Sequence, residues 1–185
     1  MKNDNPKRKV GLVTFNNEVT IVGDGIQDPD IIRGDKLLNY DFLLENGKKQ
    51  AQSYLSKPIA ETSKTLNDKL YQLEETGPTA LGPGLLTAVS LAAEGGQGSQ
   101  VVICTDGLAN IGVGSLEDKK ETEGVCEVEE FYKKVALYAK SKGVTVSIIT
   151  IKGGDEADLE TLSHVYKETG GNVSVVEPEE LTKNF

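Results

Sequence analysis

From about residue 80 onward, apolar runs of strand length alternate with stretches of helical periodicity, and this order constrains the fold more than any other feature. The expected strands are VVICT (101–105), VTVSIITI (144–151) and a last strand at 172–177. Helices are expected at 85–94, 123–142 and 155–171, and another begins near 179. Such alternation is typical of an α/β fold. Almost uninterrupted apolar strands indicate a doubly wound, mostly parallel sheet with helices on both faces.

The N-terminal half contains one strong strand signal. KVGLVTF (9–15) and EVTIV (18–22) are separated by Asn16 and Asn17, which favours a tight antiparallel hairpin. We therefore expect a single sheet in which 18–22 is the antiparallel edge strand. Residues 23–60 are expected to be irregular, with at most a short strand near 37–44, and leucines at helical spacing predict a helix over 63–76.

Composition and charge exclude several classes of function. The 185 residues suffice for one domain with a real core. A formal net charge of -9 argues against a nucleic-acid partner and against docking on anionic lipid. No apolar run is long enough for membrane insertion, and the charged N-terminus is no signal peptide. If Met1 is the natural start, a cytoplasmic protein is expected. Cys104, inside an apolar run, is expected to be buried.

Two residues are candidates for a functional site. Asp106 follows the strand at 101–105, and Thr79 lies in the loop that leads into the helix at 85–94. Ligands of open parallel sheets bind at the carboxyl ends of the strands, which is where Asp106 is expected. Carboxylate and hydroxyl oxygens suit Mg²⁺ or Ca²⁺. The alternative is structural: Thr79 as a helix cap and Asp106 as a turn residue.

Other chemistries have weaker support. The sequence contains no phosphate-binding P-loop, no dinucleotide-binding glycine motif opening a helix, and no nucleophile elbow. The single histidine, His164, lies off the apolar face of its helix, so a Ser-His-Asp triad has little support. An α/β enzyme that uses Asp106 would need a second titratable group at the same edge. Asp24 and Asp118, both in expected loops, are the candidates.

Four stretches in order resemble a von Willebrand factor A domain. They are KVGLVTFNNEV, GPTALGPGLLTAV, VVICTDGLANIG and DLETLSHVYKETGGNVSVVEPEEL, which together span about residues 9–182. Members of that family mostly bind other proteins, in adhesion molecules and, inside cells, in vesicle-coat, proteasome and chelatase assemblies. Many hold a divalent ion in a metal-ion-dependent adhesion site. The resemblance implies that Thr79 and Asp106 match the threonine and the last aspartate of that site.

The sequence departs from the family pattern at one important place. It contains no Asp-x-Ser-x-Ser, the motif that ends the family's first strand. Residues 1–185 are therefore expected to form a single but incomplete domain that lacks the first strand and helix and part of the last helix. The loss would leave 9–15 and 101–105 with unpaired edges. With two of the site's five ligand positions present, Mg²⁺ binding is expected to be weak or absent.

The resemblance favours a non-enzymatic protein–protein interaction module with a partial metal-ion-dependent adhesion site. Its partner would be a protein, and the sequence does not identify which one. The alternatives are a metal-dependent α/β enzyme and a structural domain with a vestigial metal site.

Overall fold

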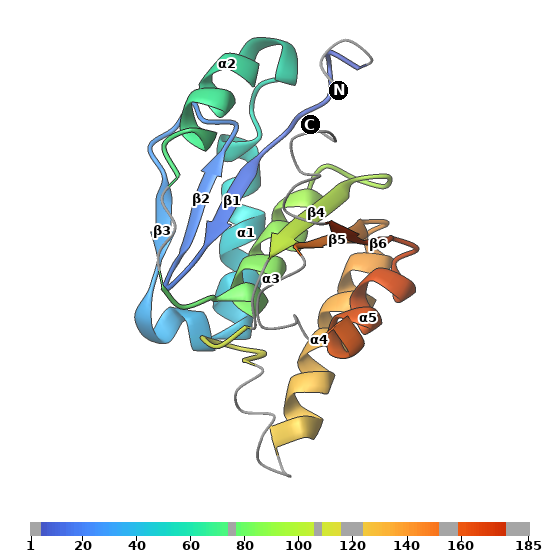
Figure 1. The fold of residues 1–185 in the computed structure, drawn as a ribbon. Coiled ribbons are helices and arrows are strands. Elements are labelled where there is room, and N and C mark those ends of the chain that lie inside the picture. Colours follow the sequence, from blue (N-terminus) through green and yellow to red (C-terminus); the bar gives the residue numbers. More distant parts are fainter. Residues whose placement is uncertain (1–4, 74–76, 106–108, 116–123, 152–158, 177–185) are drawn as a thin grey trace.

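The computed structural model contains two three-stranded sheets that pack against one shared helix (Figure 1). It describes residues 5–73, 77–105, 109–115, 124–151 and 159–176. The first sheet is antiparallel, in the order β1 (Leu12–Phe15), β2 (Val19–Gly23) and β3 (Asp30–Ile32). The second is parallel, in the order β4 (Gln100–Thr105), β5 (Thr145–Ile151) and β6 (Val173–Val176). The three predicted parallel strands are therefore confirmed.

The predicted hairpin at Asn16 and Asn17 is also confirmed. Phe15 pairs with Val19, and the backbone N–H of Asn16 donates to the carbonyl oxygen of Glu18 at 2.9 Å. The N–H of Glu18 donates in turn to the side-chain oxygen of Asn16 at 3.0 Å. Within the described residues only glycines have positive φ. The turn is therefore closed by an asparagine side chain and not by a left-handed asparagine backbone.

The prediction of a single sheet with residues 18–22 at its edge is wrong. β3 was not predicted, and it pairs with β2 on the side away from β1, with Val19 opposite Ile32. β2 is therefore the middle strand of its sheet. β1 and β4 are end strands of different sheets, and no described strand lies between them. Without such a strand no backbone ladder joins the two sheets.

The structure has more helix in its first half than the sequence predicted. The helical segments are η1 (Gly34–Leu38), α1 (Tyr40–Tyr54), α2 (Ile59–Leu70), α3 (Leu81–Ala93), α4 (Gly124–Ser141) and α5 (Leu159–Glu168). α2 begins and ends earlier than the predicted 63–76, so Leu66 is buried but Leu70 and Leu73 are about half exposed. α3 begins at Leu81 instead of residue 85, while α4 and α5 match their predicted ranges within a few residues.

Helix α1 lies where irregular structure was predicted. Its N-terminus is capped by Asn39, whose side-chain oxygen accepts the N–H of Phe42 at 2.9 Å. Its buried face has helical spacing but includes small residues, Gly47 and Ala51, beside Leu43. Small residues weaken an apolar pattern in the sequence. In the structure they let α1 approach α3 closely, because a side chain at position 47 would collide with Ser90.

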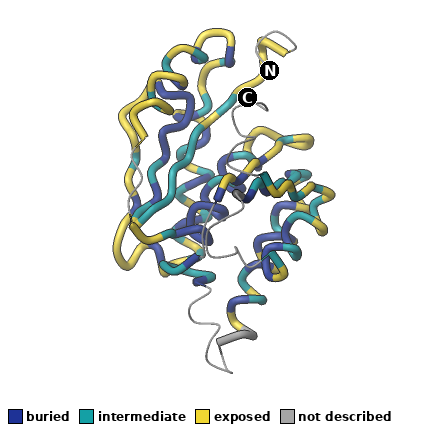
Figure 2. Tube along the Cα trace, viewed as in Figure 1, coloured by how far each residue is buried: buried dark blue, intermediate teal, exposed yellow. Residues whose placement is uncertain are grey.

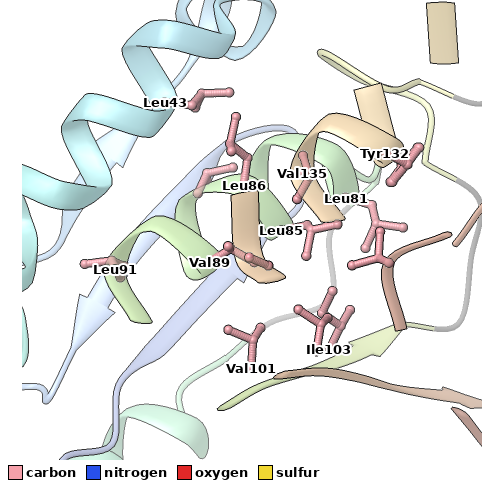
Figure 3. Packing of buried hydrophobic residues seen from close by; sticks show 14 of the residues in the cluster. Leu43, Leu81, Leu85, Leu86, Val89, Leu91, Val101, Ile103, Tyr132 and Val135 are labelled. Carbon is pink, nitrogen blue, oxygen red and sulfur yellow. The ribbon is translucent and has the colours of Figure 1, made fainter. Parts of the chain in front are cut away.

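Helix α3 is the centre of the core. All of its residues are buried except Ala88 and Ala92, which are half-buried. In Figure 3, Leu86 lies toward Leu43 of α1, while Leu81 and Leu85 lie toward α4 and β4. The contacted side chains are Leu43 of α1, Tyr132 and Val135 of α4, and Val101 and Ile103 of β4. One continuous apolar cluster therefore links the two sheets.

The parallel sheet is covered unevenly. Along β4, Val101 and Ile103 are buried, whereas Val102 and Cys104 are exposed. Val175 of β6 is exposed too, and Figure 2 shows this alternation along the strands. β4, β5 and β6 follow one another in one direction across the sheet. Right-handed connections between them place α4 and α5 on the same face of the sheet, as Figure 1 shows. Within the described ranges, helices therefore cover one face of this sheet, not both as predicted.

Candidate functional site

Thr79 lies where three loops meet. Its N–H donates to the side-chain oxygen of Asn110 at 2.7 Å, and the N–H of Asn110 donates to the carbonyl oxygen of Thr79 at 3.0 Å. The next residue, Ala80, donates its N–H to the carbonyl oxygen of Asn16 at 2.8 Å. The ends of β1 and β4 and the start of α3 are thus held together. Thr79 is not the helix cap, because that position is Ala80.

The other predicted site residue, Asp106, lies outside the described residues, and its proximity to Thr79 stays a prediction. Asn110 was missed from the sequence, although it lies in the same loop, in TDGLAN. Its side-chain oxygen already accepts the N–H of Thr79. In the part of the chain that the structure describes, no group of three or more His, Cys, Asp or Glu could hold a metal. The described residues around Thr79 therefore do not form an oxygen shell that fits Mg²⁺.

Asp24, a candidate for the enzymatic alternative, lies at the opposite end of the first sheet. It follows Gly23, which pairs with Leu12 at the start of β1, whereas Thr79 lies near the end of β1. Asp24 is fully buried, and its carboxylate accepts the N–H groups of Ile26 at 3.1 Å, Ser56 at 2.9 Å and Lys57 at 3.0 Å. These hydrogen bonds hold the loop after α1 against the end of β2, and the buried carboxylate does not face a cleft. The second candidate, Asp118, lies outside the described residues.

Cys104 was expected to be buried, and that expectation is wrong. Its position on β4 points to the uncovered face of the parallel sheet, so the residue is exposed. Its apolar neighbourhood nevertheless raises the pKa of the thiol by desolvation. His164, on α5, is half-buried and lies off the positions that α5 buries, namely Thr161, Leu162 and Val165.

We expect Cys104 to be accessible to thiol reagents but slow to react near pH 7. A raised pKa leaves less thiolate than a free cysteine has, and the thiolate is the reactive form. In a Cys126→Ser background, the rate of iodoacetamide labelling should stay below that of glutathione at pH 7. It should still be rising at pH 9, where a free thiol is mostly ionised. A faster rate than glutathione at pH 7 would contradict the direction of the shift.

A groove of about 1030 Å³ separates β1 from β4. Its floor is α3, including Leu85 and the half-buried Ala88 and Ala92. Its walls include Val13 of β1 and Val101 of β4. The floor and walls named here are apolar, and the outer edges of two strands bound the groove. The sequence analysis indicated this groove in one respect, because it predicted unpaired edges for the strands at 9–15 and 101–105.

One end of the groove is basic. Arg8, Lys9, Lys48 and Lys49 line the end where β1 and β4 begin, and Glu94 is the one carboxylate among the described lining residues. Lys48 is bonded to Glu45 at 2.6 Å, but Lys9 and Lys49 are exposed. A cluster of cations stands out on a chain with a net charge of -9. The groove thus combines apolar walls with a basic end.

Comparison with protein families gives a specific match. The sequence model of the Sec23/Sec24 trunk domain matches residues 2–179. The Circularly permutated Ras protein 1 of Dictyostelium discoideum is 38% identical over 183 residues, which is 97% of this chain and 21% of that protein. The protein transport protein SEC24-2 of Naumovozyma castellii is 29% identical over 102 residues, 50% of this chain and 11% of that protein.

A solved protein structure has a similar fold. The crystal structure of the human COPII-coat protein Sec24c aligns with a TM-score of 0.63 at 16% identity. The alignment covers 92% of this chain and 23% of that chain. This chain therefore corresponds to about a quarter or less of the length of the proteins named here.

These findings correct the assignment made from the sequence. The chain was taken for a von Willebrand factor A domain, but the matching family is the Sec23/Sec24 trunk domain. The motifs that suggested the first family, around Thr79 and Asp106, are short, and they do not separate related α/β folds. The comparisons do not support a metal-ion-dependent adhesion site.

Proposed function

Because the chain belongs to the Sec23/Sec24 trunk domain family, we propose that it is a non-enzymatic protein-interaction domain of a vesicle coat or of a coat-like assembly. The observation that carries this proposal is the family match over residues 2–179, almost the whole chain. The likeness in fold to Sec24c, a COPII-coat protein, supports it.

The geometry of the described residues is consistent with binding. The carboxylate of Asp24 accepts hydrogen bonds from backbone N–H groups within the protein. The backbone N–H of Thr79 donates to the side chain of Asn110. No described helix is long and apolar enough to cross a membrane. We place the domain at the cytosolic face of a transport membrane, where it contacts coat proteins. The support for this location is the relationship to proteins named as transport and coat proteins.

A direct binding measurement tests the proposal. The purified chain is immobilised, and purified full-length Sec23 and Sec24 coat proteins are passed over it. We expect saturable binding with a Kd on the order of 10 μM, typical of a transient interface. An Asp106→Asn variant should bind equally well, because the proposal requires no chemistry from that residue. Absence of binding to every coat protein would contradict a coat function.

A second candidate follows from a different observation. The identity with Circularly permutated Ras protein 1, 38% over 97% of the chain, exceeds the 29% shared with SEC24-2 of Naumovozyma castellii. This favours a trunk-type domain that works next to a Ras-type GTPase. The same immobilised chain can be exposed to a Ras-type GTPase loaded with GDP or with a non-hydrolysable GTP analogue. Binding to one nucleotide state, without binding to coat proteins, would favour this candidate.

A further inference from the structure

We propose that the surface where α1 meets α4 is a docking site for an acidic helix of a partner protein. This α1–α4 surface consists of Tyr40, Leu44 and Lys48 of α1, Lys134 and Tyr138 of α4, and Lys142 directly after α4. The partner helix carries two carboxylates about two turns apart, with an apolar residue between them. This inference rests on the proposed role as a protein-interaction domain and names a binding site and the chemistry of the partner.

The α1–α4 surface is built from two rows of side chains that face each other. Positions 40, 44 and 48 are four apart, as are positions 134, 138 and 142, and residues four apart share one face of a helix. Two contacts join the rows. The Nζ of Lys134 lies 3.5 Å from the ring centroid of Tyr40, and the Nζ of Lys48 lies 5.8 Å from that of Tyr138. Both helices also contribute to the core around α3, which fixes the rows relative to each other.

Two lysines give this surface its positive charge. Lys134 and Lys142 are exposed, and neither forms an ion pair with a carboxylate in the described part of the chain. The Nζ of Lys142 lies 6.0 Å from the ring centroid of Tyr138. Lys48, in contrast, is half-buried and bonded to Glu45 at 2.6 Å. Because a lysine stacked on an aromatic ring is already partly ordered, Lys134 and Lys142 can bind carboxylates at a lower entropic cost.

The surface between the two charges is apolar. Tyr40, Leu44 and Tyr138 are half-buried, and Leu137, beside Tyr138, has 61% of its surface exposed. The hydroxyl of Tyr138 is enclosed and has no hydrogen-bond partner among the described residues. The part of Tyr138 that solvent reaches therefore excludes its polar group. An apolar side chain placed between two carboxylates would cover these groups.

The spacing of the two lysines suits a helical partner. Lys134 and Lys142 are eight residues apart, which corresponds to about 12 Å along α4 at 1.5 Å per residue. Carboxylates seven or eight residues apart on a partner helix span a similar distance, and the residue midway lies on the same face. The α1–α4 surface offers no strand edge, so an extended segment would find no backbone partners there. On a chain with a net charge of -9, most other surfaces would repel an acidic helix.

The test uses the full chain and a fluorescein-labelled helical peptide of about 16 residues with the pattern Glu-x-x-x-Leu-x-x-x-Glu. Fluorescence anisotropy at low salt should show saturable binding with a Kd on the order of 10–100 μM. The affinity should fall about fivefold in roughly 0.5 M NaCl. A peptide with lysine in place of both glutamates should not bind. Backbone amide shifts measured by NMR should change in residues 40–48 and 134–142 and not in α2.

Matched variants separate the role of charge from that of packing. Lys134→Glu combined with Lys142→Glu should weaken peptide binding about tenfold at low salt. Lys9→Glu combined with Lys64→Glu changes the net charge equally and should alter the affinity less than about twofold. Lys134→Met keeps an unbranched side chain over the ring of Tyr40 and should keep Tm within about 2 °C of wild type, but should lower the affinity about threefold. A lysine that only covered the ring would leave binding unchanged in this variant.

Four results would overturn the inference. They are no binding of the acidic peptide to the folded wild-type chain, binding that Lys134→Glu with Lys142→Glu leaves unchanged, and amide shifts that map to other elements. The fourth is tighter binding to vesicles of phosphatidylserine and phosphatidylcholine that depends on the same two lysines, since the partner would then be a membrane. If coat proteins bind this double variant as they bind the wild type, the site is rejected and the proposed function stands.

Discussion

Replacing Asp24 with alanine is expected to lower the free energy of unfolding by about 3–4 kcal/mol. The carboxylate is fully buried and accepts four hydrogen bonds, three from backbone N–H groups and one from the hydroxyl of Ser56 at 2.9 Å. Alanine would leave the N–H groups of Ser56 and Lys57 without their acceptor. It would also release the loop between α1 and α2 from the end of β2.

Urea denaturation followed by circular dichroism measures this effect. Asp24→Asn should be less damaging, because the amide keeps one acceptor oxygen. Asp35→Ala, at an exposed position in η1, is the matched control and should change stability by less than about 0.5 kcal/mol. An Asp24→Ala chain as stable as wild type would mean that water replaces the carboxylate, and the loop would not depend on it.

The sequence predicted the parts of this fold in which local pattern and final environment agree. β4, β5 and β6 are short apolar runs bounded by turn residues, and they form the predicted parallel sheet. The hairpin between β1 and β2 has its turn residues between two β-rich runs, which is a local signal. Helices α4 and α5 have apolar residues at helical spacing, so their ranges were nearly right.

The errors arose where the deciding contacts are distant in sequence. Helix α1 buries Gly47 against Ser90. From sequence alone, a glycine in the middle of a segment argues against a helix, because its helix propensity is low. β3 is three residues long and is formed by pairing with β2. The single sheet was expected because a hairpin is followed in the sequence by alternating helices and strands. No local property of 9–15 or 101–105 tells whether they pair with each other.

Part of the candidate site could likewise be predicted from the sequence, and part could not. The loop that contains Thr79 was placed correctly at the strand ends, because carboxyl ends of strands and the starts of following helices meet in α/β folds. Asp24 could not be assigned from sequence, since an aspartate after a strand has the same appearance whether it fastens loops or faces a cleft. The groove depends on two edges facing each other across α3, and a linear pattern does not contain that arrangement.

Replacing Leu86 with alanine is expected to lower the free energy of unfolding by about 3–4 kcal/mol and Tm by roughly 10 °C. Leu86 is fully buried on α3, among the residues drawn in Figure 3. Truncation removes apolar contacts and leaves a cavity in the one helix that both sheets share. Because the apolar cluster is continuous across both sheets, both should unfold in one transition, earlier than in the wild type.

Differential scanning calorimetry, with near-ultraviolet circular dichroism of the tyrosines, follows the unfolding of this variant. Leu137→Ala is the control, because Leu137 lies on α4 with 61% of its surface exposed, and it should shift Tm by at most about 2 °C. Two separate transitions in the wild type would show that the sheets unfold independently. In that case α3 would not couple them.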